Sequence, residues 1–326
     1  RMAQTPLLDI HNLFLYYSSR EGPVQAVDDL SLKIYPGRAV GVLGESGCGK
    51  SSVSKAILRL LPSNVARHQG RIWMDGVDIM SLGEETFRRQ VRWVKISLVA
   101  QAAMNALNPV ARIGRQVEEA LLAHDLTTKR EAQDRIRRVF SQVDLPEDVI
   151  QRYPFQLSGG MRQRAVIAMA LVAEPRLVIL DEPTSALDLL TQANIMNTLK
   201  RIKGDLNTSF MFITHDVGTC SELADAVAVM YAGQLVELAE AATFFRQPLH
   251  PYSQKLMASV PRLYAEQELQ SIPGRPPSLI NPPAGCRFRD RCDQSFDKCR
   301  QTPPMLTTPD GSLAKCWLYE AEAIQT

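Results

Sequence analysis

A glycine-rich turn between an apolar segment and an amphipathic segment limits the fold of this chain more than any other feature. The apolar residues 39–43, AVGVL, lead directly into a turn that fits the pattern G-x-x-x-x-G-K-[ST], from Gly44 to Ser51. Apolar side chains of the next segment share one helical face: Val53, Ile57, Leu60 and Leu61. A strand, a glycine turn and a helix in this order predict an α/β fold with a phosphate site at the turn.

The residue types in this turn suit a phosphate ligand. Glycines allow backbone N–H groups to converge on phosphate oxygens at a helix N-terminus, where the partial charge is positive. Lys50 is predicted to reach the β and γ phosphates of a nucleotide, and Ser51 to offer its hydroxyl to Mg²⁺. The predicted nucleotide-binding residues here are Gly44, Glu45, Ser46, Gly47, Cys48, Gly49, Lys50, Ser51 and Ser52.

A second strand-like segment ends in two acidic residues. Leu177–Leu180 is apolar and runs into Asp181 and Glu182, and a buried strand would not carry adjacent carboxylates without a cation or a proton-transfer task. Taken alone, such a pair is more often a helix N-cap, but together with a phosphate-binding loop it predicts catalysis. Asp181 is predicted to hold Mg²⁺ through water, and Glu182 to orient and deprotonate the water that attacks the γ-phosphate.

A third motif is specific to one family. The octapeptide LSGGMRQR at 157–164 precedes an apolar helix, so Ser158, Gly159 and Gly160 form a second anion-binding helix N-terminus. This octapeptide resembles the signature of the ATP-binding-cassette (ABC) ATPases. In that family the signature of one subunit closes over the ATP held by the phosphate-binding loop of another. The resemblance therefore implies a head-to-tail pair of cassettes.

The resemblance assigns three further residues to the ATP site. Gln101 resembles the glutamine that touches Mg²⁺ and couples to the membrane partner, although Ala100-Gln101-Ala102-Ala103 departs from the usual Phe-Gln-Asp/Glu-Pro. Asp188, in Ser185-Ala-Leu-Asp, resembles the end of the loop that communicates across the dimer and is expected at the nucleotide. His215, after a predicted strand, resembles the histidine that contacts the γ-phosphate.

Two adjacent tyrosines are candidates for stacking on adenine. Tyr17 lies 27 residues before Gly44 and is the favoured residue, with Tyr16 the alternative. Alternation along a strand places only one of the two on the nucleotide face.

Four of the six cysteines lie close together near the C-terminus. Cys286, Cys292, Cys299 and Cys316 are separated by five, six and sixteen residues. Four thiolates suit either tetrahedral Zn²⁺ or an iron–sulfur cluster, and this spacing departs from the short C-x-x-C pairs of structural zinc sites. The neighbouring Arg287, Arg289 and Arg291 could suggest a nucleic-acid-binding finger, but eight basic and eight acidic residues after Pro261 argue against it.

The C-terminal part also carries a resemblance. His250-Pro251-Tyr252, Ile272-Pro-Gly-Arg-Pro-Pro and Gly285–Cys292 resemble the C-terminal extension of ATPase subunits from dipeptide, oligopeptide and related importers. Members of that subfamily carry a [4Fe-4S] cluster, so the resemblance favours [4Fe-4S] on the four cysteines, with zinc as the alternative. His250-Pro251-Tyr252 itself is predicted to start a helix that packs back on the cassette.

Composition changes along the chain and predicts two domains. Nine of the 20 prolines follow Val260. We expect an ABC ATPase nucleotide-binding domain over 1–260, with a helical subdomain at about 101–173, and a C-terminal oligopeptide-transporter extension with the cysteine cluster over 261–326. The predicted fold class is an α/β P-loop ABC cassette with an inserted helical subdomain and a small irregular C-terminal cysteine-cluster domain.

Net charge and hydropathy limit the kinds of partner that the chain is expected to bind. Lys and Arg total 37 and Asp and Glu total 35, so the bulk charge does not indicate a nucleic-acid partner. The longest apolar run, Ala165–Ala173, has nine residues, about half of the roughly 20 needed to cross a bilayer. The resemblance thus implies an ATP-hydrolysing subunit of a peptide importer, peripheral at the cytoplasmic face of the membrane.

Such a subunit needs other proteins. The resemblance implies a second ABC ATPase subunit, expected to be a different sister chain, two transmembrane permease subunits and an extracytoplasmic substrate-binding protein. The alternative is a soluble ABC ATPase of DNA repair or translation with a structural zinc module. Those proteins usually carry long coiled coils or two cassettes in one chain, and the sequence has neither.

Overall fold

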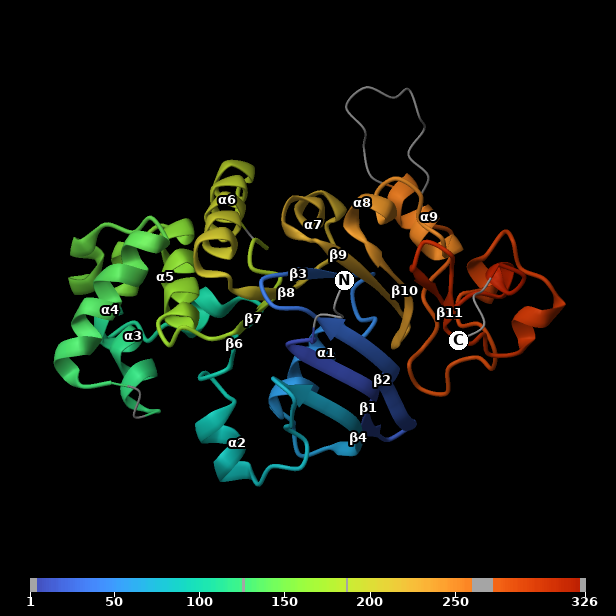
Figure 1. Ribbon diagram of the computed structural model, residues 1–326, viewed down its shortest axis with the longest axis horizontal. Helices are drawn as coiled ribbons and strands as arrows, with labels where there is room; N and C mark the ends of the chain where they lie inside the picture. Colours follow the sequence, from blue (N-terminus) through green and yellow to red (C-terminus); the bar gives the residue numbers. More distant parts are fainter. Residues whose placement is uncertain (1–4, 125–126, 186, 260–271, 323–326) are drawn as a thin grey trace. The chain divides into compact units, whose positions relative to one another are not determined.

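The computed structural model describes residues 5–124, 127–185, 187–259 and 272–322 (Figure 1). The chain forms two compact units. The first contains Arg1–Leu7, Ile34–Ala39 and Asp75–Phe212, and the second contains Leu8–Lys33, Val40–Met74 and Ile213–Thr326. The predicted domain boundary near Val260 lies outside the described residues. The predicted separate C-terminal cysteine domain is not supported, because that part of the chain packs within the second unit.

Buried parallel strands form the centre of the first unit. β6 (Ile96–Val99) pairs in parallel with β7 (Leu177–Asp181), with Ile96 opposite Leu177, and β8 (Ser209–Thr214) follows next in the order β8-β7-β6. Every residue of β7 is buried, as expected for a parallel strand covered on both faces. The predicted strand at 177–180 is confirmed and ends with its acidic residue at the carboxyl edge. Smaller elements of this unit are β5 (Val77–Asp78) and α2 (Glu84–Gln90).

The segment after β6 is helical, as predicted. It contains η1 (Ala103–Ala106), α3 (Ile113–Leu122), α4 (Lys129–Gln142), η2 (Glu147–Gln151), η3 (Pro154–Gln156) and α5 (Gly159–Leu171). Helices α3, α4 and α5 pack on one another and are drawn in green in Figure 1. A capping box of Thr128 and Glu131 starts α4, which satisfies backbone N–H groups of its first turn. α6 (Leu189–Leu206) follows and also contacts α5.

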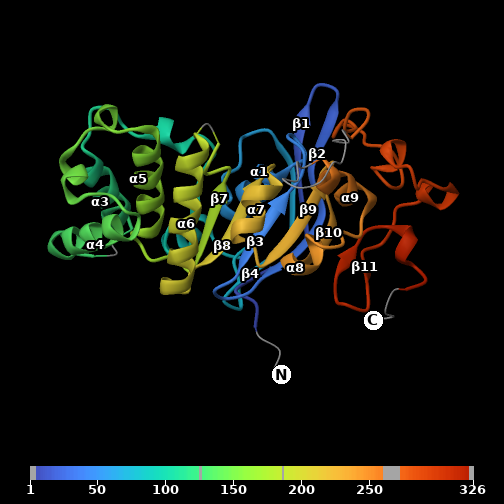
Figure 2. The same cartoon turned by 90° about the horizontal axis from the view of Figure 1, so that it is seen from above.

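An antiparallel sheet opens the second unit. β1 (Leu8–Ser19) lies between β2 (Gly22–Ile34) and β4 (Val65–Met74), and Figure 2 shows β1 and β2 side by side. The pairing of β1 with β4 shifts register between Tyr16 and Tyr17. A bulge at this point changes the direction of the two tyrosine side chains relative to simple alternation.

The second unit also contains the strand that leads into the phosphate-binding loop. β3 (Ala39–Leu43) pairs in parallel with β9 (Ala226–Tyr231), and the order continues antiparallel through β10 (Gln234–Glu240), β12 (Leu313–Ala314) and β11 (Leu306–Thr307). The helices of this unit are α1 (Lys50–Leu58), α7 (Val217–Leu223), α8 (Ala241–Phe244) and α9 (Pro251–Ala258). Short 3₁₀ turns occur at η4 (Arg289–Arg291), η5 (Asp297–Arg300) and η6 (Trp317–Tyr319).

Helix α1 is shorter than the apolar spacing predicts. It ends at Leu58 because Arg59 takes a left-handed conformation with φ of 51° and closes the helix with its own N–H. The Leu60 side chain is therefore outside the helix and 45% exposed. In the part of the chain that the structure describes, no helix combines the length and apolarity needed to cross a membrane.

Candidate ATP-binding site

The phosphate-binding loop requires glycine at positions where the backbone passes close to another strand. A Cβ atom on Gly49 would lie 1.9 Å from the carbonyl oxygen of Ala26, and Gly49 has φ of 106°, which side chains disfavour. A Cβ atom on Gly44 would lie 2.3 Å from the carbonyl oxygen of Met230. The turn that the sequence predicts between β3 and α1 is therefore present, and its shape depends on close approach as well as on glycine conformation.

Lys50 lies inside this loop. Its side chain is 5% exposed, and its Nζ donates to the carbonyl oxygens of Gly44 at 2.7 Å and Glu45 at 2.9 Å. A buried ammonium group needs such partners, because desolvation of an isolated charge is costly. The contacts hold the charge at the N-terminus of α1, where Ser51 and Ser52 form the first turn. The thiol of Cys48 lies 3.9 Å from the same Nζ, and burial raises its pKa, so it is a neutral neighbour at pH 7.

The two candidate adenine-stacking tyrosines have different surroundings. The Tyr17 hydroxyl donates to Ser52 Oγ at 3.3 Å, so this side chain lies beside the first turn of α1. The Tyr16 hydroxyl donates instead to the Asp28 carboxylate at 2.5 Å. Burial and this hydrogen bond raise the pKa of Tyr16 to about 12. Tyr17 is therefore the one next to the phosphate-binding loop.

In the first unit, the structure brings Gln101 and Glu182 together. Gln101 Nε2 donates to Glu182 Oε2 at 3.0 Å. The contact arises because the residues follow the carboxyl ends of the paired parallel strands β6 and β7, which meet at one edge of the sheet. Asp181, the last residue of β7, is 5% exposed. Glu182 has φ of 49°, and its carbonyl oxygen accepts from Ser185 Oγ at 2.9 Å, which fixes the turn after the strand.

The signature residues form the predicted helix N-terminus. Ser158 is the N-cap of α5, and its Oγ accepts from the backbone N–H of Met161 at 3.3 Å. A Cβ atom on Gly160 would lie 2.6 Å from Thr191 Cγ2, so the start of α5 packs tightly against the start of α6. Gly159 completes the first turn.

Asp188 and His215 are both at helix-capping turns. Asp188 is the N-cap of α6 and accepts from the backbone N–H of Thr191 at 3.0 Å and from its hydroxyl at 2.7 Å. These hydrogen bonds lower the pKa of Asp188. His215 is exposed in the turn after β8, just before Asp216, the N-cap of α7. The predicted roles of Asp188 and His215 at the nucleotide stay predictions.

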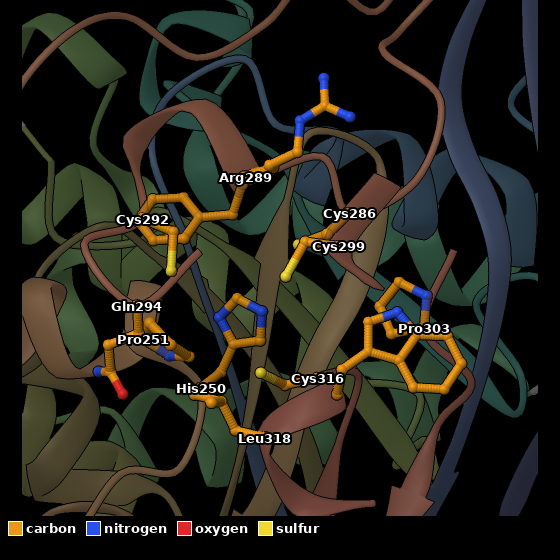
Figure 3. A pocket seen from close by; sticks show the side chains of 12 residues that line it. His250, Pro251, Cys286, Arg289, Cys292, Gln294, Cys299, Pro303, Cys316 and Leu318 are labelled. Carbon is orange, nitrogen blue, oxygen red and sulfur yellow. The ribbon is translucent and has the colours of Figure 1, made fainter. Parts of the chain in front are cut away.

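The four C-terminal cysteines line one pocket in the second unit. Cys286, Cys292, Cys299 and Cys316 lie around the His250 ring, and Figure 3 shows their side chains turned toward this space. His250 is 1% exposed, and its Nδ1 accepts from the backbone N–H of Tyr252 at 3.1 Å. Burial lowers the pKa of His250 to about 3, so the imidazole is neutral. The predicted clustering of the cysteines is therefore present.

The electrostatics of this pocket disfavour free thiolates. Burial, with neighbouring cysteines adding to it, raises the pKa of Cys286 and Cys292, and raises that of Cys316 to about 11. Within residues 5–124, 127–185, 187–259 and 272–322, no group of three or more His, Cys, Asp or Glu side chains is arranged to hold a metal ion. A single zinc ion would need all its sulfur ligands at about 2.3 Å.

Two residues near the phosphate-binding loop were not predicted as site residues. The guanidinium of Arg291 donates to both carboxylate oxygens of Glu45, and the hydroxyl of Tyr252 accepts from the Glu45 backbone N–H. Sequence reasoning considered Arg291 only as part of a possible nucleic-acid finger. Its burial was not evident, because its acidic partner lies 246 positions earlier in the chain.

Comparison with known proteins decides the family. Residues 27–185 match the family model described as ABC transporter, and residues 236–299 match the oligopeptide/dipeptide transporter C-terminal region. The chain is 40% identical to the dipeptide transport ATP-binding protein DppD of Caldanaerobacter subterraneus, with 96% of this chain and 97% of DppD covered. The chain belongs to the ABC transporter ATP-binding family. The oligopeptide transport ATP-binding protein OppD of Salmonella typhimurium is also 40% identical, with coverage of 95% and 93%.

A solved structure confirms the α/β cassette fold of this ABC protein. The ATP-binding cassette MJ0796, solved as a dimer bound to ADP and Pi, matches with a TM-score of 0.63 and 26% identity. The match covers 72% of this chain and 98% of MJ0796. ABC ATP-binding subunits hydrolyse ATP, and this chain is an ATPase of that class. The alternative of an ATPase in DNA repair or translation is not favoured, because the relatives are transport proteins.

Proposed function

We propose that this ABC protein hydrolyses MgATP to drive import of peptides through separate membrane subunits. The hydrogen bond between Gln101 and Glu182 is the main support for the catalytic assignment. It joins the amide predicted to touch Mg²⁺ to the carboxylate predicted to activate water, just after the carboxyl ends of β6 and β7. The peptide cargo is inferred from relatives named as dipeptide and oligopeptide transport proteins over nearly the full length of this chain.

Each site residue then has a chemical task. Lys50 balances the charge of the β and γ phosphates, and the loop N–H groups from Gly44 to Ser52 bind their oxygens. Ser51, Gln101 and Asp181 would supply oxygen ligands, which Mg²⁺ prefers, and the bound ion would neutralise charge on the phosphates. Glu182 accepts the proton of the attacking water, and the hydrogen bond from Gln101 orients its carboxylate. His215 donates to the γ-phosphate, and Tyr17 stacks on adenine.

The signature residues serve a second cassette in this proposal. Ser158, Gly159, Gly160 and Asp188 complete the ATP site of a partner subunit, and the dimeric state of MJ0796 supports such a pair. The partner is a sister ATPase chain in a heterodimer. The pair binds two transmembrane permease subunits at the cytoplasmic face of the membrane and works with an extracytoplasmic substrate-binding protein.

We further propose that the four cysteines hold a [4Fe-4S] cluster. All four line one pocket, and a four-iron cluster takes one thiolate per iron, which spreads the sulfurs farther apart than one zinc ion does. The bound cluster would supply structural cross-links between η4, η5 and η6.

Iron analysis tests this cluster. Anaerobically purified protein should be brown and contain iron and acid-labile sulfide in comparable amounts. Cys299→Ser should remove the colour and loosen the local fold, because metal binding in such modules is coupled to local folding. MgATP binding should persist, because Cys299 lies outside the nucleotide-binding motifs. Cys220→Ala is the matched control, since Cys220 is buried in α7, does not line the pocket and should leave the iron content unchanged. A colourless wild-type protein with one tightly bound zinc would contradict the cluster.

Glu182→Gln tests the catalytic assignment. The amide preserves the size and the contact with Gln101 but cannot accept the water proton, so ATP turnover in the assembled transporter should fall roughly 10²–10⁴-fold. The Kd for MgATP should stay within about twofold of wild type, because the substitution removes proton transfer in the transition state and not binding of the nucleotide. Lys50→Ala is the contrasting variant, because it removes the phosphate-facing charge and should weaken binding itself. Wild-type turnover by Glu182→Gln would remove Glu182 from this role.

A further inference from the structure

The C-terminal segment reaches the phosphate-binding loop through one buried arginine. Arg291 Nη1 donates to Glu45 Oε2 at 2.8 Å, and Nη2 donates to Oε1 at 3.0 Å. The Arg291 side chain is 6% exposed and that of Glu45 is 27% exposed. A bidentate contact of this kind sets the orientation of the carboxylate as well as its distance.

Arg291 has little freedom to leave this position. Its Nε donates to the carbonyl oxygen of Pro273 at 2.8 Å, and its Nη1 also donates to the Tyr231 hydroxyl at 3.2 Å. Its own carbonyl oxygen accepts from Lys255 Nζ at 3.2 Å. The guanidinium is thus bonded on several sides, unlike an exposed surface ion pair, whose side chains remain mobile.

A second residue of the C-terminal part holds the backbone of the same loop position. The Tyr252 hydroxyl accepts from the Glu45 N–H at 2.9 Å, and Tyr252 is fully buried. Its ring packs against Tyr231, with centroids 4.6 Å apart, and against Phe288 at 5.4 Å. Both the side chain and the backbone N–H of Glu45 are therefore fixed by residues outside the nucleotide-binding motifs.

The contact continues from Glu45 to the phosphate-facing lysine. The Glu45 carbonyl oxygen is one of the two that accept from Lys50 Nζ, at 2.9 Å. Lys50 Nζ also donates to the Gly44 carbonyl oxygen at 2.7 Å, and this carbonyl shares its peptide plane with the Glu45 N–H that Tyr252 holds. The order of contacts is thus Arg291 to Glu45 to Lys50.

We infer that Arg291 is a positioning residue of the ATP site, which holds Glu45 so that the phosphate-binding loop and Lys50 keep the geometry that binds nucleotide. This inference rests on the proposed ATP-dependent function and extends its site to the C-terminal segment. Without Arg291 the loop spends only part of its time in the binding geometry, and the apparent Kd rises by the inverse of that fraction.

The same network connects the cysteine pocket to the loop. Arg291 ends η4 directly before Cys292, and Phe288 lines the cysteine pocket while its ring lies 5.1 Å from that of Tyr231. Figure 3 shows Cys292 and His250 at this pocket. Arg291 and the cysteine pocket therefore share neighbours, because Phe288 lines the pocket and packs on Tyr231, the ring beside Arg291.

Nucleotide binding by the full-length chain and steady-state ATPase kinetics of the assembled transporter test the role of Arg291. Arg291→Gln should raise the Kd and the KM for MgATP about tenfold, while kcat at saturating MgATP stays within about twofold; tenfold corresponds to about 1.4 kcal/mol. Arg291→Lys should give a smaller rise, because a point charge reaches the carboxylate but does not form the bidentate pair. Arg300→Gln is the matched control, as an exposed arginine of the same segment.

A double variant checks that the effect passes through Glu45. Glu45→Gln alone should also raise the KM, and adding it to Arg291→Gln should add little, because the two residues act as one pair. If Arg291→Gln does not fold, Glu45→Gln and Arg291→Lys carry the test.

Three outcomes would overturn either the positioning role of Arg291 or the proposed function. A normal KM in Arg291→Gln, or in both Glu45→Gln and Arg291→Lys, would overturn the positioning role. A lower melting temperature with unchanged KM would overturn it too, by making Arg291 purely structural. A wild-type chain that does not bind MgATP would instead refute the proposed ATPase function, so the two failures are distinguishable.

Discussion

Replacing Arg287 with methionine should destabilise the protein through the charge that it leaves behind. Arg287 Nη2 donates to Asp28 Oδ2 and to Gln25 Oε1, and Nη1 donates to the carbonyl oxygen of Ala232, each at 2.5 Å. The ion-paired side chains are 6% and 15% exposed. Methionine keeps much of the apolar stem but removes every donor, so a buried carboxylate loses its counter-charge.

The size of the stability loss depends on the hydrogen bonds that Asp28 retains in the variant. Breaking a buried ion pair by removing one partner costs roughly 3–5 kcal/mol. Asp28 still accepts hydrogen bonds from Tyr16 at 2.5 Å and from Gln234 at 2.9 Å, which offset part of the loss. We therefore expect a decrease of about 3 kcal/mol in the free energy of unfolding at pH 7, the lower end of that range.

The loss should depend on pH in a defined direction. Burial favours a higher pKa for Asp28, but hydrogen bonds from Tyr16 and Gln234 and the charge of Arg287 outweigh it and lower the pKa below its ordinary value. Such a carboxyl contributes stability above its unfolded pKa of about 3.8, and this is lost as the pH falls through the folded value. In the variant the pKa rises, so protonation relieves the penalty, and the difference from wild type should shrink below about pH 5.

Urea unfolding followed by tryptophan fluorescence at several pH values measures this difference. Arg300→Met is the control, because Arg300 is exposed and its loss should change stability by less than about 0.5 kcal/mol. Adding Asp28→Asn to Arg287→Met should restore part of the stability, since it removes the unpaired charge. A loss below about 1 kcal/mol, or one that stays constant down to acidic pH, would refute the reasoning.

Two further predictions concern the nucleotide site. Ser158→Arg should leave the Kd of this chain for MgATP unchanged but lower the ATPase rate of the assembled pair at least about tenfold, because the arginine obstructs a site shared with the partner. An ATPase rate equal to that of the wild-type pair would contradict the shared site. Gly49→Ala should raise the Kd for MgATP by roughly 100-fold, because its Cβ would meet the Ala26 carbonyl oxygen at 1.9 Å. Gly204→Ala is the control, since Gly204 lies in open space on α6 and this variant should bind MgATP normally. Similar affinities of the two variants in titration calorimetry would count against the clash.

Much of the candidate site could be predicted because its motifs are local. The phosphate-binding loop, the acidic end of β7 and the N-cap of α5 each join a strand or helix to the residues next to it, so spacing of a few residues determines them. Family resemblance then supplied the roles. The clustering of four cysteines followed from their short separations, which loop closure favours.

Tertiary structure decided the features that depend on distant residues. The end of α1 at Leu58 and the bulge between Tyr16 and Tyr17 depend on left-handed backbone and on pairing with another strand, neither of which apolar spacing reveals. The C-terminal part joined the second unit rather than forming its own domain, because its aromatic and arginine side chains bury against the cassette.

The pairing of Arg291 with Glu45 shows most clearly why contacts between distant residues could not be predicted from the sequence. Either residue alone is an ordinary charged residue that sequence reasoning assigns to solvent or to a ligand. Only the fold brings them together, with the Arg291 side chain buried at 6% exposed and the Glu45 carboxylate partly buried at 27% exposed, so that the buried guanidinium has a carboxylate partner. The sequence by itself determined which local segments can bind phosphate, and the packing between segments 246 positions apart determined what holds them in place.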